Sequence, residues 1–381
     1  MKHQPLAVVG IILGAFLSVT LASTSVESFG SGFEASSCST FHPASDFFEG
    51  VEKRIEIFFE VAESDEHGLR SLSRDAWNTI CDKAKCEIIH EEVVGRFDSY
   101  ILSESSLFVY RDRLMMKTCG TTLPLSSVDE IVAQAKQVVS ITGPLRMVYS
   151  RSSFLSSTQQ SSPHHDFDVE IEYLNTLAVD GQVIEGETVV HGDIDAKYWL
   201  VHTKEFKYSN QPNLIMAECM MTGLSAPSRA SFYQNPLLDM EANEAAMAAT
   251  FKDVLPYSIE GKCFTPCGYS CNARGTSHAD LDSYFTVHVT PQEAFSYSSV
   301  EAVFTNEENV MNKISDFVIN TISVFTPMEV SVNIIAHQGL HIVLPPRLRL
   351  DSGESYTLQH EDCSTKTSRI VYSLDYRVVS V

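Results

Sequence analysis

The chain has 381 residues, of which 44% are hydrophobic, so it can bury a large core as one big domain or two ordinary ones. Its 27 Lys and Arg against 49 Asp and Glu leave a net charge of −22. Such a charge repels nucleic-acid phosphates and anionic membrane surfaces. The composition therefore argues against nucleic-acid binding and, more weakly, favours a cationic ligand.

The first 45 residues differ from the rest of the chain. An apolar run extends from Leu6 to Ala22 and a serine-rich stretch follows to about Ser45, a pattern typical of a signal peptide or short membrane anchor. Against a secreted mature protein, the nine cysteines are an odd number and no Asn-x-Ser/Thr sequon occurs. We expect residues 1–45 to be a leader outside the fold, and residues 46–381 to form one domain with free thiols.

Hydrophobic periodicity predicts both strands and helices in this domain, with no internal repeat. Strands come in runs instead of alternating strictly with helices, which favours an α+β fold of mainly antiparallel sheets with helices on their outer faces. The predicted strands are 52–59, 86–94, 100–110, 114–118, 182–191, 198–203, 283–290 and 328–335. The predicted helices are 74–84, 126–139, 166–177, 241–251 and 306–322.

Familiar catalytic and metal-binding motifs are absent. There is no G-x-S-x-G, H-E-x-x-H or phosphate-binding loop. The spacing of Cys263, Cys267 and Cys271 fits neither a zinc pair nor an iron–sulfur run, so small buried thiols are expected and no metal. The run from Ser103 to Ser106 is, by itself, typical of a turn or a strand end.

Five segments carry a family resemblance: FFEGVEK at 47–53, YILSESSLFV at 100–109, KTCGTT at 117–122, FTPCGYS at 264–270, and HVTP at 288–291 followed by FSY at 295–297. In this order they resemble the eukaryotic S-adenosylmethionine decarboxylases, and the resemblance extends from residue 46 to the C-terminus. It implies a four-layer αββα sandwich of two mainly antiparallel sheets with outer helices. It also implies pyruvoyl-dependent decarboxylation of S-adenosylmethionine to the aminopropyl donor for spermidine and spermine.

The resemblance implies that the chain cleaves itself between Glu104 and Ser105. The Ser105 hydroxyl attacks the preceding carbonyl to form an ester, and loss of the α-proton then expels the Glu104 carboxylate, leaving dehydroalanine that hydrolyses to a pyruvoyl group. Ser270 is implied to support the intermediate and His288 to act as the base. The covalent pyruvoyl group forms a Schiff base with the substrate and withdraws electrons, the task of pyridoxal phosphate elsewhere, so neither that cofactor nor a metal is expected.

The resemblance also assigns residues to the substrate. Cys119 matches the donor that returns a proton to the α-carbon. Phe48 and Phe264 match two rings that sandwich adenine and offer aromatic faces to the sulfonium. Gln292 stands where the family has a Glu that holds the ribose hydroxyls, and an amide lacks charge-assisted strength, so weaker substrate affinity is expected. The remaining implied substrate contacts are Glu49, Glu52, Leu102 and Glu104.

A charged cluster corresponds to the site where putrescine binds in animal members of the family. Arg54 occupies a position that is apolar in animals and basic in plants, so its guanidinium is expected to supply the charge of the diamine. Activation by putrescine is therefore doubtful. The expected partners are S-adenosylmethionine and the two chains of one precursor, and a dimer of such pairs is left open. The other cluster positions are Glu56, Lys117, Glu218 and Glu301.

Two alternatives stay open on the sequence. One is a catalytically dead family member that binds and regulates an active subunit; retention of Ser105, Cys119, Ser270 and His288 argues against it. The other is a secreted acidic binding protein, which rests only on the leader. By resemblance the protein is cytosolic, whereas the leader raises membrane, organelle or secretory targeting.

Overall fold

The computed structural model describes residues 48–138, 140–207, 214–254, 257–265, 267–275, 281–305, 309–337, 342–366 and 369–379. The predicted leader lies outside these residues, as do Phe47 and Pro266 of the segments that carry the resemblance. No helix in the described part of the chain is long and apolar enough to cross a membrane.

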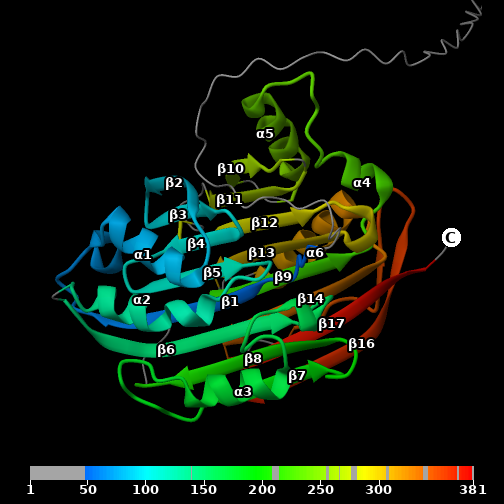
Figure 1. Ribbon diagram of the computed structural model, residues 1–381. Helices are drawn as coiled ribbons and strands as arrows, with labels where there is room; N and C mark the ends of the chain where they lie inside the picture. The colour runs from blue at the N-terminus through cyan, green and yellow to red at the C-terminus, as the bar shows by residue number, and fades with distance from the viewer. Residues whose placement is uncertain are drawn as a thin grey trace, which may run out of the picture. The chain divides into compact units, whose positions relative to one another are not determined.

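Two antiparallel sheets form the body of the described chain (Figure 1). The first sheet has the order β2-β3-β4-β5-β1-β6-β8-β7, and the second has the order β10-β11-β12-β13-β9-β14-β17-β16-β15. The first contains β1 (Lys53–Val61), β2 (Ile88–Val94), β3 (Phe97–Leu102), β4 (Ser105–Val109), β5 (Arg113–Thr118), β6 (Ile141–Ser152), β7 (Glu187–Gly192) and β8 (Tyr198–Glu205). The second contains β9 (Leu214–Thr222), β10 (Tyr257–Cys263), β11 (Tyr269–Gly275), β12 (Tyr284–Thr290), β13 (Tyr297–Thr305), β14 (Glu329–His337), β15 (Arg347–Arg349), β16 (Ser355–Lys366) and β17 (Arg369–Val379).

Helices cover the outer face of each sheet, and their apolar sides form two of the three cores. Trp77 and Ile131 lie in the outer core of the first sheet, and Phe317 lies in that of the second. The first sheet carries α1 (Arg74–Ala84), α2 (Val128–Ala135) and α3 (Phe167–Thr176); the second carries α4 (Ala226–Ala230), α5 (Met240–Ala248) and α6 (Val310–Phe325). Short 3₁₀ turns are η1 (Gly68–Ser71), η2 (Pro124–Ser127), η3 (Ser157–Gln159), η4 (Ala249–Phe251) and η6 (Glu293–Phe295).

A third core fills the space between the sheets. Phe108 of β4 stacks on Tyr284 of β12 with ring centroids 4.2 Å apart, and Met115, Met216 and Ile335 pack in the same cluster. Aromatic and unbranched side chains can fill such a layer while polar neighbours share it. The molecule is thus an α+β, four-layer αββα sandwich, which confirms the predicted fold class.

The two sheets repeat one strand order. The order 2-3-4-5-1-6-8-7 recurs as 10-11-12-13-9-14-17-16, with β15 added at the edge. The sequence shows no such repeat, because topology can recur without any recurring spacing of residues. The inner strands β1 and β5 face β9 and β13, and buried ion pairs join them across the gap. This arrangement places the functional residues between the sheets.

Several predicted elements need correction. The helix predicted at 74–84 has those bounds, and Ser73 caps it by accepting a hydrogen bond from Ala76 N. The strand predicted at 100–110 is wrong: the chain reverses after Leu102 and a new strand starts at Ser105. Strands β6, β9, β10, β11, β13, β15, β16 and β17 were not predicted.

Candidate active site

The turn between β3 and β4 contains only Ser103 and Glu104, since Leu102 and Ser105 pair directly across the two strands. Ser105 has φ of 141°, a conformation that a side chain with a Cβ rarely adopts, and it is buried. The Ser103 N–H donates to Glu87 O at 2.7 Å, and the Glu87 N–H donates to Ser103 Oγ at 3.0 Å. The strained serine is therefore held in place by an anchored turn.

The residue after Ser105 anchors β4 to the second sheet. Ser106 Oγ donates to Asn272 Oδ1 at 2.6 Å, and Asn272 Nδ2 donates to Ser99 Oγ at 3.0 Å and to Tyr100 O at 2.9 Å. The Asn272 side chain of β11 thus forms hydrogen bonds with both β3 and β4. These buried bonds restrain the hairpin against relaxing the strain at Ser105.

Two donors from Cys119 point at the carbonyl oxygen of Glu104. The backbone N–H lies 2.9 Å from this oxygen and the thiol sulfur lies 3.2 Å from it. Cys119 directly follows β5, whose last residue Thr118 pairs with Ser105. Burial raises the pKa of the Cys119 thiol well above its usual value, and the nearby carboxylates of Glu104 and Glu52 act in the same direction. The thiol is therefore a protonated donor near neutral pH.

The Ser105 hydroxyl donates to a buried carboxylate. Its Oγ lies 2.6 Å from Glu52 Oε1, while Glu52 Oε2 accepts from Ser299 Oγ of β13 and lies 3.3 Å from Lys117 Nζ. Glu52 immediately precedes β1, which fixes its backbone beside the sheet. This carboxylate is placed to take the hydroxyl proton when the oxygen acts as a nucleophile.

Ser270 and His288 form a pair on neighbouring strands of the second sheet. They are register partners on β11 and β12, and Ser270 Oγ lies 3.0 Å from His288 Nδ1. Burial lowers the pKa of His288, Glu52 opposes this effect and Lys117 adds to it. The imidazole is thus neutral near pH 7 and able to accept a proton. His288 is also the register partner of Ser299, which donates to Glu52.

Phe48 and Glu104 meet at Gly120. A Cβ at Gly120, which has φ of 62°, would lie 3.6 Å from the Phe48 ring and 3.5 Å from Glu104 Oε2. Burial raises the pKa of Glu104 to about 7, and hydrogen bonding from Cys119 and the charge of Lys53 oppose the rise. Any side chain in place of Gly120 would enter this space.

Glu49 uses both carboxylate oxygens within the protein. Oε1 accepts from Val51 N at 3.2 Å and Oε2 from Ser156 N at 2.9 Å. Burial raises the pKa of Glu49, and these backbone donors oppose the rise. The carboxylate therefore shapes the segment beside Phe48 rather than presenting unused oxygens.

Phe264, Gln292 and Leu102 differ in how accessible they are to a ligand. Phe264 lies between β10 and β11, where Gln234 Nε2 donates to Phe264 O and to Thr265 Oγ1, each at 3.2 Å. No ring contact joins it to Phe48 within the described residues. Gln292 Oε1 is buried and has no hydrogen-bond partner in that part of the chain. The Leu102 side chain is fully buried in the outer core, so only its backbone can face a ligand.

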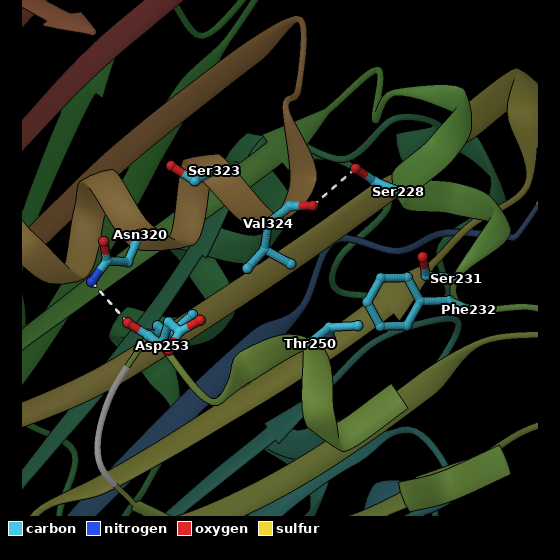
Figure 2. Close-up of a pocket in the computed structure, with 9 residues that line it drawn as sticks. Ser228, Ser231, Phe232, Thr250, Asp253, Asn320, Ser323 and Val324 are labelled. Atoms are coloured by element: carbon cyan, nitrogen blue, oxygen red, sulfur yellow. Dashed lines mark hydrogen bonds between the residues drawn. The ribbon is translucent and has the colours of Figure 1, made fainter. Parts of the chain in front are cut away.

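A cavity of about 370 Å³ lies away from these residues, between α4, η4 and α6 (Figure 2). Its polar groups mostly bond the protein itself: Ser228 Oγ donates to Val324 O at 2.9 Å and Asn320 Nδ2 to Asp253 O at 2.9 Å. None of the predicted site residues lines it. In the described part of the chain, no group of three His, Cys, Asp or Glu could hold a metal ion.

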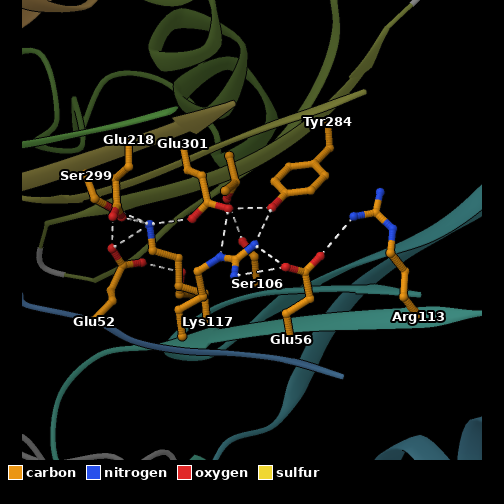
Figure 3. Close-up of polar contacts among 12 residues, drawn as sticks. Glu52, Glu56, Ser106, Arg113, Lys117, Glu218, Tyr284, Ser299 and Glu301 are labelled. Carbon is orange, nitrogen blue, oxygen red and sulfur yellow. Dashed lines mark hydrogen bonds and ion pairs between the residues drawn. The ribbon is translucent and has the colours of Figure 1, made fainter. Parts of the chain in front are cut away.

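A charged cluster occupies the space between the sheets (Figure 3). The Arg54 guanidinium donates to Glu301 Oε1 at 3.0 Å, to Glu56 Oε2 at 3.2 Å and to Tyr284 OH at 3.3 Å. Arg113 NH1 donates to Glu56 Oε1 at 2.9 Å. Burial alone would lower the pKa of Arg54, but Glu301 and Glu56 overcome it and the pKa rises. The guanidinium is a permanent cation of this cluster.

Lys117 links the cluster to the Ser105 region. Its ammonium bonds Glu218 and lies 3.3 Å from both Glu52 Oε2 and Glu301 Oε2. Burial raises the pKa of Glu218 to about 7; Lys117 opposes the rise, whereas Glu301 and Glu52 add to it. Glu218 can therefore share a proton near neutral pH.

The structure brings the predicted residues together in two groups. Ser105, Glu104, Glu52 and Cys119 are in direct contact, and the five predicted cluster residues are joined by ion pairs. Further residues of both groups were not predicted from the sequence: most are brought there by the packing of the two sheets, whereas Lys53 reaches the Ser105 group from the outer face of β1. They are Lys53, Ser106, Arg113, Asn272, Tyr284, Tyr297 and Ser299.

The described chain is therefore an α+β sandwich in which Glu52, Glu104 and Cys119 surround the strained backbone of Ser105. A family model described as adenosylmethionine decarboxylase matches residues 45–378. S-adenosylmethionine decarboxylase proenzymes are similar: that of Caenorhabditis elegans is 34% identical over 69% of this chain and 70% of its own length. That of Drosophila melanogaster is 32% identical over 77% of this chain and 84% of its own length. That of Oryza sativa subsp. japonica is 35% identical over 77% of this chain and 73% of its own length. The chain belongs to the adenosylmethionine decarboxylase family.

A solved structure, the Trypanosoma brucei AdoMetDC-delta26 monomer, covers 72% of this chain and 100% of its own at 20% identity, with a TM-score of 0.48. The similarity at this level is too low to support an inference about the site.

Proposed function

We propose that this chain is a proenzyme that cleaves itself between Glu104 and Ser105. The mature enzyme then decarboxylates S-adenosylmethionine, with a pyruvoyl group formed from Ser105. Residues up to Glu104 would form the small chain, and Ser105 to Val381 the large one. The product is the aminopropyl donor for spermidine and spermine synthesis.

The observation that carries the proposal is the strained backbone conformation of Ser105, directly after the turn. Ser105 has φ of 141°, and both reacting groups of the cleavage already have partners: its Oγ donates to Glu52, and the Glu104 carbonyl oxygen accepts from Cys119 N and Sγ. Breaking the bond at this position releases the backbone strain. Donors aimed at the carbonyl oxygen stabilise the charge that develops there when the hydroxyl attacks.

The chain's own residues suit each step of cleavage. Glu52 takes the hydroxyl proton as Ser105 Oγ bonds to the Glu104 carbonyl carbon, and the C–N bond breaks to leave an ester and a free amine. His288, neutral and held by Ser270, removes the α-proton of residue 105, and the Glu104 carboxylate leaves. Hydrolysis of the resulting dehydroalanine releases ammonia.

The residues around Ser105 fit a pyruvoyl group, because the group forms from that residue and is then enclosed by the same buried donors. When present, it supplies an electron sink for the bond that loses carbon dioxide. Cys119, a protonated thiol, gives the proton to the substrate's α-carbon. Gln292 Oε1, buried and without a partner among the described residues, accepts from a ribose hydroxyl, and Phe48 and Phe264 hold adenine.

Release of labelled carbon dioxide tests this function. The purified full chain is given S-adenosylmethionine labelled in its carboxyl carbon, and the uncleavable Ser105→Ala variant serves as the matched control. We expect release from the parent chain and none above background from the control. A parent chain that is cleaved but releases no label would refute the decarboxylase assignment.

We also propose that the enzyme needs no diamine activator. The support is that Arg54 already neutralises Glu56 and Glu301 from between the sheets, in the place a bound diamine would need. Putrescine added to the purified enzyme should change its activity by less than about twofold. A severalfold rise would refute this part of the proposal and would leave the decarboxylase assignment standing.

A further inference from the structure

Lys53 is a buried lysine next to the Ser105 region. It lies on the face of β1 opposite to Arg54, the face that also carries Ile55 and Ile57 into the outer core, and its side chain is fully buried. Nζ donates to Gly120 O at 2.8 Å and to Gln160 Oε1 at 3.0 Å. Gly120 directly follows Cys119, so the ammonium holds the segment that carries the thiol.

Within the described part of the chain, Lys53 makes no ion pair. A buried ammonium without a carboxylate partner costs several kcal/mol, so most buried charges are paired. Burial lowers the pKa of Lys53 to about 8, and Cys119 is the strongest of the groups that oppose the fall. A packed apolar residue or an ion-paired charge would cost less here than this ammonium, which lies 5.2 Å from the centre of the Phe154 ring but has no carboxylate partner among the described residues, and this marks Lys53 as a functional candidate. The charged or titratable groups around it are Cys119, Glu170, Glu49, Arg151, Glu104 and His164.

We propose that Lys53 is the positioning residue of Cys119: it fixes the thiol through Gly120 O and stabilises the thiolate that remains after the thiol donates its proton. This inference rests on the proposed function. In that step the S–H bond breaks and the proton forms a C–H bond at the substrate's α-carbon, using the electron pair left by carbon dioxide. A nearby fixed positive charge lowers the energy of the thiolate, which water then reprotonates.

The first test measures the thiol without any turnover. In the uncleaved Ser105→Ala chain, iodoacetamide labelling of Cys119 is followed by peptide mass spectrometry, with the exposed Cys363 as an internal reference. Alkylation requires the thiolate. Lys53→Met should lower the Cys119-to-Cys363 rate ratio about tenfold or more, which corresponds to one pKa unit of lost interaction. Lys53→Arg should keep the ratio within about threefold, since its charge stays.

Lys204 provides a matched control. It is also a buried lysine that bonds two backbone carbonyls, Asn175 O at 3.1 Å and Leu177 O at 2.7 Å, at the end of α3. Lys204→Met removes an equivalent charge away from Cys119 and should leave the labelling ratio unchanged. A loosened fold would raise the ratio, so a fall specific to Lys53→Met separates charge from packing.

The second test is the pH profile of kcat in the cleaved enzyme. Activity of the parent should fall as pH rises through about 8, where Lys53 loses its charge. In Lys53→Arg this fall should move upward by more than one pH unit, because a guanidinium stays charged. If Lys53→Met does not fold, this comparison decides alone.

An unchanged labelling ratio in a folded Lys53→Met chain overturns the proposal. So does a fall of kcat at the same alkaline pH in the parent and in Lys53→Arg. A parent chain that does not cleave itself contradicts the proposed function instead. In that case the labelling comparison still reports on Lys53.

Discussion

The Ser105 region and the charged cluster occupy the same space between the sheets and treat buried polar groups in opposite ways. Around Ser105 the contacts are hydrogen bonds from neutral donors, and the backbone at residue 105 is strained. In the cluster, full charges meet: Arg54 bonds Glu56 and Glu301, and Lys117 bonds Glu218. Glu52 belongs to both regions, since it contacts Ser105 and Lys117.

The two regions differ in which of their buried groups can gain or lose a proton. In the cluster, ion pairs hold Arg54 and Lys117 in their charged forms, and Glu218, whose pKa is raised to about 7, can take up a proton. Near Ser105, by contrast, burial keeps the Cys119 thiol protonated and the His288 imidazole neutral, so the thiol can donate a proton and the imidazole can accept one.

The largest expected effect concerns the hydrogen-bonded pair of Ser270 and the neutral His288. His288→Ala removes the group proposed to take the α-proton, so cleavage should stop and the chain should stay whole or as the ester. A denaturing gel after hydroxylamine treatment, which cuts esters, measures both forms. Cleavage at the parent's rate in this variant would mean that the pair is only structural.

The second effect tests the role of the charges. Arg54→Met leaves Glu56 and Glu301 short of one cation, which should lower the free energy of unfolding by about 3–5 kcal/mol. Added putrescine should then restore stability, as measured by the melting temperature. Arg151→Met, which breaks a buried pair with Glu170 on the other face of the sheet, is the matched control. Equal rescue of both variants would argue against a specific site.

A smaller effect concerns pH. Because the pKa of folded Glu218 is raised to about 7 from 4.5, the folded state binds more protons than the unfolded state between these values, and stability should fall as pH rises from 4.5 to 7. Glu218→Gln should remove this fall in the free energy of unfolding, which amounts to up to about 3 kcal/mol. Denaturant unfolding of both chains at pH 5 and 7 measures it. If the free energy of unfolding changes equally with pH in both chains, Glu218 stays ionised between pH 5 and 7.

The smallest effect should be at Gln292. Gln292→Glu would give a charged acceptor to a ribose hydroxyl, and KM for S-adenosylmethionine should fall by about threefold to tenfold with kcat little changed. Steady-state kinetics of the cleaved variant measure both constants. A rise in KM would place the ribose elsewhere.

Periodicity predicted the class of fold but not all of its strands. The run at 100–110 is rich in β-formers on both sides of Ser103 and Glu104, and this pattern outweighed the serines, which are typical of a turn. The position of the reversal is set by pairing with neighbouring strands, which the local pattern does not encode. The repeated strand order of the two sheets was not predicted for the same reason.

The site was predictable only where short segments carried it. Ser105 and Cys119 stand in the motifs of the family, whereas Arg113 and Tyr284 join the charged cluster from strands that the sheet packing alone brings together. Lys53 stood within a motif, but its lack of an ion pair among the described residues is a property of the folded chain. Both Lys53 and Arg54 next to it are buried, and their partners distinguish them: Lys53 bonds two uncharged oxygens, whereas Arg54 pairs with Glu301.

The most direct test of the central claim is the intact mass of the purified protein. The account predicts two chains, with the small chain ending at Glu104 and the large one beginning with a pyruvoyl group at residue 105. A single uncleaved chain, or a large chain that begins with an unmodified serine, would contradict it.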